Sequence, residues 1–372
     1  MLRSRHLTHI IGCFIIFSLL SYSHHSYAQT ELPTESCLME WNRAVAKNFA
    51  DTLIKATNDP MQVWDTYKLG DGAVILNAGK NSDSLNCLGL FRNGQVLGYL
   101  ETEESPKLAT PLYGYYLNFE EIVNQEDNPL LGISVQPKQI SQWLESYQIE
   151  SAVLMPVEFP KFPFKIPTLK KVQIAIHEAF HVEVMLRYWF TKKGKWPAWD
   201  AQPSRSETRE CYNLNEEISS TFREEQLTLS RLIDALIEDK KEQVCELGNS
   251  YLNQREKRYQ QVKEVKVTRA DETICDCKEA EVIMELEEGI ADYASWAMLY
   301  DIGISSREEL IQRYQASQNE PFYLTGAMLL HAIAIMSNDN IEAAIEKMVK
   351  AQTPLDGSLL ALFKEKLSLY CR

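Results

Sequence analysis

The chain has 372 residues, of which 45% are hydrophobic and 24% are charged, so it is long enough to build one large or two modest domains around a substantial core. Its 52 acidic residues outnumber its 38 basic residues and give a formal net charge of −14 at pH 7. This balance argues against nucleic acid or an anionic membrane surface as a partner, because both carry negative charge.

Residues 1–28 are typical of a secretory signal peptide. Two arginines precede a short apolar run, Ile10–Leu20, which is too short to span a bilayer. The small residues Ser26 and Ala28 form a cleavage site, so we expect a secreted or periplasmic protein with no stable membrane anchor. A lipoprotein-like box ends at Cys13, but the apolar run continues past it, which argues against lipidation.

Removal of that segment leaves seven cysteines, which is an odd number. Export favours disulfide formation, and the odd count leaves at least one cysteine without a disulfide partner in the chain. The spacing does not define the pairing. Cys275 and Cys277 are too close together and too isolated to predict a second zinc site, which needs four ligands. The seven residues are Cys37, Cys87, Cys211, Cys245, Cys275, Cys277 and Cys371.

The N-terminal part, residues 29–150, is predicted to hold a helix and a small antiparallel β unit. Apolar residues recur at helical spacing over 35–58. A short apolar run follows the Gly-Asp-Gly turn at 70–72, and the segment from Leu88 to Leu100 predicts a β-hairpin that folds at Asn93-Gly94. A further strand is expected at 112–117 and a short helix at 139–147.

The C-terminal part, residues 151–372, is predicted to start with a strand at 151–157 and to be helical afterwards. Prolines exclude a regular helix up to residue 167. A helix over 168–190, with Thr168 as its N-cap, is apolar on most sides and is therefore expected to be buried. The charged stretch at about 207–263 predicts an inserted helical hairpin with a solvated face. Further helices are expected at 279–300, 323–336, 341–351 and 357–369. The fold class is α+β, mostly helical.

The predicted buried helix contains His177-Glu178-Ala179-Phe180-His181, an H-E-x-x-H motif. Residues four apart share one helix face, so both imidazoles can reach one ion. A catalytic zinc takes three protein ligands and keeps one position open for water. Glu178 lies beside them and is expected to act as the general base. The motif predicts a hydrolase with one Zn²⁺; the alternative is a helix with two hydrogen-bonded histidines and no metal.

The third ligand must come from another segment. A metzincin would have glycine and histidine where this chain has Val184 and Arg187, which excludes that class. The segment Glu287-Glu288-Gly289-Ile290-Ala291-Asp292 resembles the glutamate helix of the gluzincins, the thermolysin-like and aminopeptidase-like zinc peptidases. This resemblance implies a zincin-like catalytic domain in residues 151–372.

The same resemblance implies specific roles on that helix. Glu288 would be the third ligand, and Asp292, one turn later, would accept a hydrogen bond from a liganding histidine. Small residues such as Gly289 would let this helix approach the metal helix closely. Glu285 is the alternative ligand, whereas Glu281 and Glu287 are not expected to bind.

An oxyanion donor is the last part of such a site. Tyr323-Leu324-Thr325-Gly326 resembles the Tyr-x-x-Gly segment of aminopeptidase-like gluzincins, which implies Tyr323 as that donor; the alternative is a core tyrosine. His331 is expected to be a buried structural residue, with a second donor role as the alternative. The resemblance does not reach the first 150 residues. The chain also lacks the G-x-M-x-N peptide-anchoring motif of typical aminopeptidases and the Asn-Ala substrate-binding segment of thermolysin-like enzymes. These departures imply a divergent branch of the gluzincins.

These features predict an exported zinc metallopeptidase that hydrolyses peptide bonds through a zinc-activated water. His177, His181 and Glu288 would bind the metal, and Glu178 would be the base. The expected partner is a peptide or protein substrate, which would pair with the edge of the strand at 151–157. Two alternatives remain open: a zinc-binding protein without catalysis, and a zinc hydrolase that acts on other substrates.

Overall fold

The computed structural model describes most of the chain outside the first 33 residues. The predicted signal peptide, the strand at 112–117 and the helix at 341–351 lie outside the described residues. No described helix is both long and apolar enough to cross a membrane. The described residues are 34–58, 62–64, 67–79, 86–103, 138–149, 152–158, 166–181, 183, 208, 211–212, 214–268, 274–315, 321–337 and 358–372.

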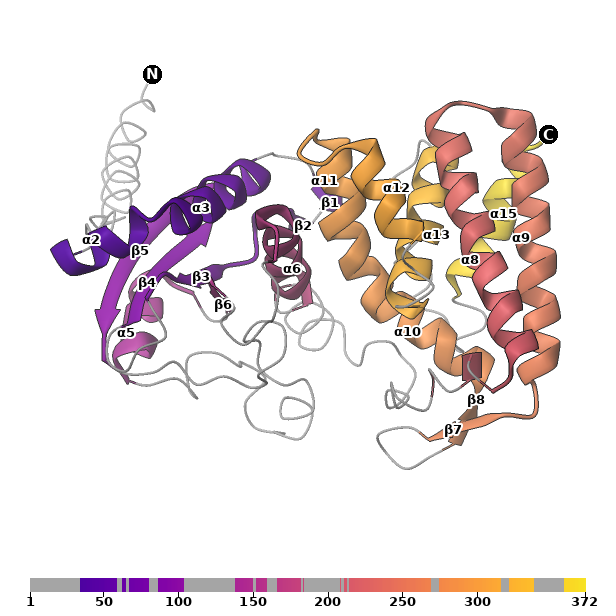
Figure 1. Cartoon of the computed structure of the whole chain (residues 1–372), viewed down its shortest axis with the longest axis horizontal. Coiled ribbons are helices and arrows are strands. Elements are labelled where there is room, and N and C mark those ends of the chain that lie inside the picture. The colour runs from indigo at the N-terminus through magenta and orange to yellow at the C-terminus, as the bar shows by residue number, and fades with distance from the viewer. Residues whose placement is uncertain are drawn as a thin grey trace, which may run out of the picture.

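The protein is an α+β structure that is mostly helical, as predicted. A small mixed sheet occupies one end and a bundle of helices the other, and helix α6 (Thr168–Phe180) lies between them (Figure 1). The helix with the H-E-x-x-H motif is therefore the element at which the two parts meet.

The sheet has four strands in the order β5-β4-β3-β6. The hairpin of β4 (Asn86–Arg92) and β5 (Gln95–Thr102) is confirmed, and the φ angles of 50° and 68° at Asn93 and Gly94 suit a tight type I′ turn. β3 (Val74–Asn77) pairs antiparallel with β4 and parallel with β6 (Val153–Pro156). The predicted division at residue 150 therefore passes through this sheet. A separate two-stranded ribbon joins β1 (Gln62–Trp64) and β2 (Tyr67–Lys68).

Alternating residues give the sheet two apolar faces. On one face, Ile75 and its neighbours pack with Trp143 of α5 (Lys138–Ser146). On the other, Val74 and its neighbours share a core with α3 (Ala44–Thr57) and α6. The single helix predicted over 35–58 is wrong in one detail. The extended backbone of Arg43 separates α2 (Glu35–Trp41) from α3.

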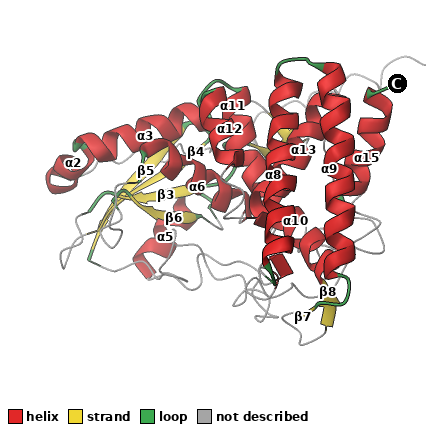
Figure 2. Ribbon diagram, turned by 45° about the vertical axis from the view of Figure 1, so that its right-hand side comes forward, coloured by secondary structure: helices red, strands yellow, loops and turns green. Residues whose placement is uncertain are grey.

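The bundle begins with the predicted helical hairpin, which is confirmed as α8 (Glu216–Ile237) and α9 (Lys241–Val262) (Figure 2). The helix predicted over 279–300 is interrupted by a wide π-helical turn, η2 (Tyr293–Ala297). The remaining elements are β7 (Lys266–Thr268), β8 (Ile274–Asp276), α10 (Cys277–Asp292), α11 (Met298–Asp301), α12 (Arg307–Gln315), α13 (Pro321–Ser337) and α15 (Leu359–Tyr370).

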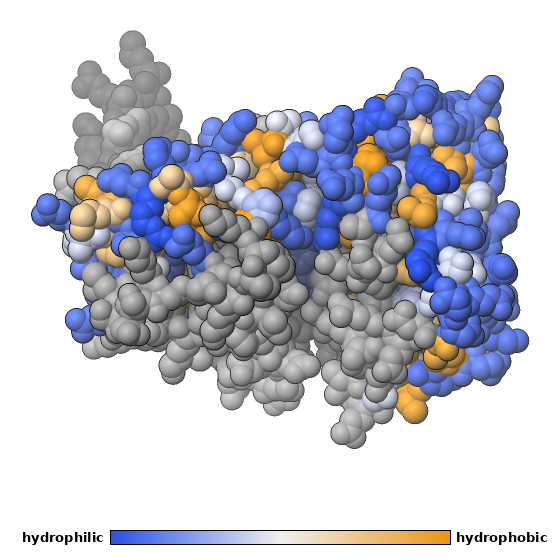
Figure 3. Space-filling model, viewed as in Figure 1, coloured by the Kyte–Doolittle hydropathy of each residue, from blue (hydrophilic) through white to orange (hydrophobic). Residues whose placement is uncertain are grey.

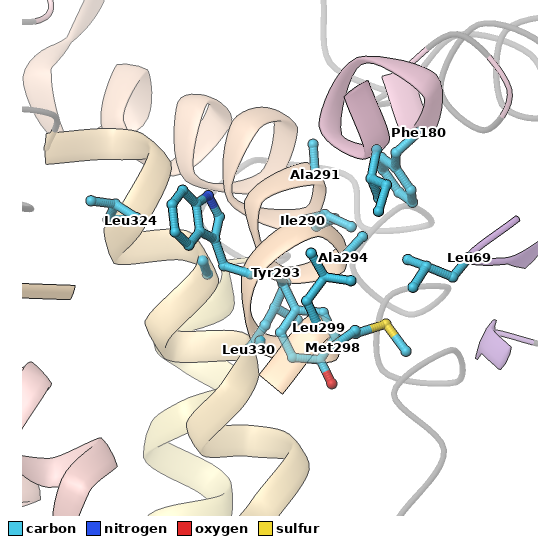
Figure 4. Packing of buried hydrophobic residues seen from close by; sticks show 14 of the residues in the cluster. Leu69, Phe180, Ile290, Ala291, Tyr293, Ala294, Met298, Leu299, Leu324 and Leu330 are labelled. Carbon is cyan, nitrogen blue, oxygen red and sulfur yellow. The ribbon is translucent and has the colours of Figure 1, made fainter. Parts of the chain in front are cut away.

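One continuous apolar core joins the sheet, α6 and the bundle. Figure 4 shows Phe180 of α6 and Leu69 facing Ile290, Ala294 and their neighbours on α10 and the π-helical turn. Buried apolar contacts hold elements in fixed relative positions because the interior is close-packed. The two helices that carry the predicted metal ligands are thus fixed against each other.

The outer surface of the α8–α9 hairpin is mainly hydrophilic (Figure 3). The interpretation of its charge as a solvated face is nevertheless wrong for three residues. Glu225, Arg255 and Arg258 have no exposed surface, because they pair with one another and with α10. Their positions could have been recognised, since Arg255 and Arg258 lie on the apolar stripe of α9.

Three disulfides brace the described chain, and they join Cys37–Cys87, Cys211–Cys277 and Cys245–Cys371. Cys275 is buried and takes part in none of them. The odd number of cysteines predicted that at least one would form no disulfide within the chain, and this is confirmed. The pairing of Cys277 with Cys211 also removes it as a zinc ligand.

Candidate metal centre

Helix α6 presents the two histidines of the motif. Its N-cap is Pro167 rather than Thr168, which is the first helical residue. The start of a helix tolerates a proline, because the backbone N–H that proline lacks would have no hydrogen-bond partner within the first turn. α6 ends at Phe180, but His181 keeps helical angles, with φ −55° and ψ −48°. His177 and His181 therefore stay one turn apart on the same face.

Glu288 of α10 meets these two histidines. Its Oε2 lies 3.3 Å from Nε2 of His177 and 3.3 Å from Nε2 of His181. The two Nε2 atoms are 3.0 Å apart. Three ligand atoms thus converge on one point, and the group could hold a metal ion. Within the described residues, no other set of histidine, cysteine, aspartate and glutamate side chains does so.

The donor set itself fits a cation. A proton between the two imidazoles satisfies one pair of atoms, whereas a metal ion bonds to both nitrogens and the carboxylate at once. The other imidazole nitrogen of His177, Nδ1, lies 2.8 Å from Oδ1 of Asp292. A hydrogen bond there fixes the tautomer that leaves Nε2 as a metal ligand. Asp292 is therefore found at the position predicted for it.

The acidic surroundings of His177 favour positive charge. Burial by itself would lower the pKa of His177, but the hydrogen bonds to Asp292 and Glu288 and the charge of Glu178 outweigh it and raise that pKa to about 10. The pKa of Asp292 is shifted in the opposite direction. Its burial is opposed by His177, Arg313 and Lys170, which together lower its pKa.

Glu178 and the two histidines lie near the surface of the cluster. His177 and Glu178 are each 8% exposed, and the side chain of His181 is 17% exposed, against 2% for Glu288. His181 is therefore the most exposed member of the cluster, and Glu288 is the most deeply buried. Glu178 follows His177 directly on α6, and its charge acts on that histidine.

The alternative ligand, Glu285, has a different partner. Its Oε1 accepts hydrogen bonds from Nη1 and Nη2 of Arg255, each at 2.9 Å. Glu281 likewise pairs with Arg258 at 2.7 Å. Both carboxylates belong to a buried ion-pair network with α8 and α9. Glu281 thus has a cationic partner away from the histidines, and the side chain of Glu287 lies outside the described atoms.

Gly289 serves a contact other than the predicted one. A Cβ atom on Gly289 would lie 2.4 Å from Cα of Gly326, so the glycine faces α13 and not the metal helix. A Cβ atom on Gly326 would lie 2.1 Å from the carbonyl oxygen of Glu285. The two glycines let α10 and α13 cross backbone against backbone.

The two residues considered as oxyanion donors have different outcomes. Tyr323 lies in the first turn of α13, one turn before Gly326, and its side chain is outside the described atoms. The role of Tyr323 stays a prediction. His331 is buried, and its Nδ1 is 3.2 Å from the hydroxyl of Tyr314. The imidazole of His331 also contacts the aromatic rings of Tyr293, Tyr300 and Tyr314. These contacts place His331 in the core, as expected of a structural histidine.

Sequence reasoning missed two cations near the cluster. Arg313 of α12 lies 3.8 Å from Oδ2 of Asp292, and Lys170 of α6 packs over Trp296 beside it. Lys170 is two helical turns from His177, a spacing that places both on one face of α6. Nothing in the sequence brings Arg313 to that face.

Comparison with family models, with curated proteins and with solved structures finds no match to this chain. The functional argument therefore depends on the residues and their geometry.

Proposed function

We propose that the protein is an exported zinc metallopeptidase. The observation that carries the proposal is the convergence of His177, His181 and Glu288, with separations of 3.0, 3.3 and 3.3 Å between their ligand atoms. Zinc bound tetrahedrally at about 2.0 Å places its ligands about 3.3 Å apart. Two imidazoles and one carboxylate are also the ligand set of known zinc peptidases.

Hydrolysis needs a nucleophile, a base and a route for the proton. A bound zinc ion would lower the pKa of a water molecule and polarise a carbonyl group. Glu178 would take the proton of the attacking water and deliver it to the leaving amine. Asp292 would hold His177 in its liganding tautomer. Tyr323 is the proposed donor to the oxyanion.

A peptide substrate is supported by the edge of the sheet. β6 is an edge strand next to β3 in the described part of the sheet, and it lies against α6. The backbone N–H groups of Val153 and Val157 donate to the carbonyl oxygens of Ala73, just before β3, and Asn77 of β3, so the N–H of Leu154 points to the other side. Pro156 has no N–H to offer. An extended peptide bound along this edge could therefore accept a hydrogen bond from the N–H of Leu154 and donate to the carbonyl groups that point away from β3.

The test combines metal analysis with peptide-library cleavage. The purified wild type should contain about one zinc per chain and should cleave members of the library. Glu178→Gln should keep the zinc and lose cleavage, because it removes the base and none of the ligands. Glu224→Gln, the same change at an exposed position of α8, serves as the control and should leave both unchanged.

Three outcomes contradict the proposal in different ways. A wild type without zinc removes the metal centre. Undiminished cleavage by Glu178→Gln removes the mechanism. Zinc without cleavage of any peptide favours one of the two alternatives, a zinc-binding protein without catalysis or a hydrolase of other substrates.

A further inference from the structure

The two carboxylate oxygens of Asp292 have different surroundings. Its Oδ1 faces Nδ1 of His177 at 2.8 Å. Its Oδ2 is buried and has no hydrogen-bond donor among the described residues. The cation beside it is Arg313, whose Nη2 lies 3.8 Å from Oδ2. A buried carboxylate without such compensation is unfavourable. The charge of Arg313 therefore bears directly on where this carboxylate lies.

Arg313 is held in its place by aromatic and apolar contacts. Its guanidinium carbon lies 4.7 Å from the ring centroid of Trp296, and Nζ of Lys170 lies 4.6 Å from the same ring. Cations at this distance from an indole ring are attracted to it. Tyr314, the next residue of α12, has no exposed surface, so the helix that carries Arg313 is anchored.

The backbone contributes through the wide π-helical turn that begins at Tyr293, directly after Asp292. Such turns are rare and often occur at functional sites. Here the turn carries Trp296, so the aromatic platform and the carboxylate come from one continuous stretch of chain. α6 supplies His177 and Lys170, and α12 supplies Arg313.

The two cations lie behind the metal position and not in front of it. The metal position is on the Nε2 side of His177, where Glu288 and His181 converge. Asp292 bonds to Nδ1, on the opposite side of the ring. A group that faces Asp292 is thus separated from the substrate side by the imidazole. Arg313, whose side chain is 14% exposed, is placed to act on the histidine and not on a substrate.

We propose that Arg313, seated on Trp296 with Lys170, is a positioning residue that orients the Asp292 carboxylate and through it the metal ligand His177. The inference rests on the proposed metal centre and goes beyond it. Without the guanidinium, Oδ2 of Asp292 loses its nearest cation and the carboxylate turns toward water or Lys170. The hydrogen bond to Nδ1 of His177 then weakens, and so does the metal site.

The test is the zinc affinity of the metal-free protein, measured by competition with a chromophoric chelator. Asp292→Asn should weaken binding about 10- to 100-fold, and Arg313→Met should weaken it about tenfold. Arg313→Lys should restore most of the loss, because it keeps the cation. The matched control is Arg307→Met on the same helix, whose side chain pairs with Asp234 and Glu238. It should bind zinc as the wild type does.

A double-mutant cycle separates positioning from a general loss of stability. If Arg313 acts through Asp292, Arg313→Met should cause no further loss of affinity in the Asp292→Asn background. The visible spectrum of bound Co²⁺ should change in Arg313→Met and return with Arg313→Lys. Wild-type affinity in Arg313→Met, an additive effect in the cycle, or an equal loss in Arg307→Met would each overturn the inference. A wild type that binds no zinc would instead remove the metal centre on which it rests.

Discussion

Gly289 of α10 and Gly326 of α13 are in backbone contact, and this contact sets the position of the predicted ligand Glu288. A Cβ atom at Gly289 would lie 2.4 Å from Cα of Gly326, which is closer than real Cβ atoms approach. Because the opposing atom belongs to a backbone, the neighbour cannot turn away. The crossing links the residue beside the predicted ligand Glu288 to the segment that carries Tyr323.

Alanine at either glycine should therefore separate the two helices. We expect Gly289→Ala and Gly326→Ala to destabilise the protein by about 1–3 kcal/mol, as overpacking does, and to weaken zinc binding. Urea unfolding and chelator competition measure the two effects. Gly248→Ala is the control, because a Cβ atom there meets side-chain atoms of Leu367 that can move. Equal, small effects at all three glycines would show that the crossing tolerates a methyl group.

The buried ion-pair network predicts opposite effects for two neighbouring glutamates. Three carboxylates, Glu225, Glu281 and Glu285, share two guanidiniums, so one negative charge is in excess. Burial and the other carboxylates raise the pKa of Glu285 to about 8 despite Arg255. Burial also opposes ionisation of Glu281, but Arg255 and Arg258 lower its pKa to about 2.

The sign of the pH dependence follows from these directions. The folded pKa of Glu285 lies above its unfolded value of 4.5, so its contribution to stability is complete below pH 4.5 and is lost as the pH rises toward 8. Glu285→Gln should remove that decline and make the protein more stable than the wild type near pH 8. The folded pKa of Glu281 lies below its unfolded value of 4.5, so Glu281 stabilises the folded protein fully above pH 4.5. This stabilisation is lost as the pH falls toward 2.

Chemical denaturation between pH 5 and pH 9 tests both variants. Glu281→Gln breaks a buried pair and should cost about 3–5 kcal/mol at neutral pH. Glu285→Gln should cost little at pH 5, because a glutamine oxygen can still accept from Arg255. Parallel curves for the wild type and Glu285→Gln over the whole range would contradict the raised pKa of Glu285.

Removal of the metal should lower the stability of the folded protein. The proposed ligands come from α6 and α10, and the unfolded chain does not hold them together, so zinc binds the folded state selectively. Zinc at about 100 times its dissociation constant should add about 2.7 kcal/mol. Thermal unfolding with and without a chelator measures the difference. His181→Ala should show no response to the chelator, whereas Glu178→Gln should respond as the wild type does.

The disulfide Cys245–Cys371 joins α9 to the C-terminal end of α15 across a sequence separation of 126 residues. The double substitution Cys245→Ser with Cys371→Ser should cost about 2–5 kcal/mol, since it frees a long loop in the unfolded chain. Zinc affinity should stay unchanged, because neither residue lies in α6 or α10. A thiol count on the unfolded, non-reduced protein expressed without residues 1–28 gives the reference value: one reactive thiol, from Cys275.

The amino-acid sequence alone determined the local features of this protein. The spacing of His177 and His181 follows from helical periodicity, and the Asn93-Gly94 turn and the α8–α9 hairpin follow from local patterns. The resemblance to gluzincin motifs further implied Glu288 and Asp292, and the structure places both beside the histidines. The helical spacing, the turn and the hairpin each depend on residues that are near one another in the chain. Glu288 lies 111 residues from His177, and only the resemblance pointed to it.

Only the tertiary structure decided the contacts between distant segments. It brought Glu288 to the two histidines, whereas Glu285 pairs with Arg255, 30 residues away in the sequence. It also turned Gly289 toward α13, and it brought Arg313 to the side of Asp292 remote from the metal position. A helical stripe shows which side of a helix is buried but not which neighbour buries it. That choice is made by close packing of the whole core, and one sequence contains no local signal for it.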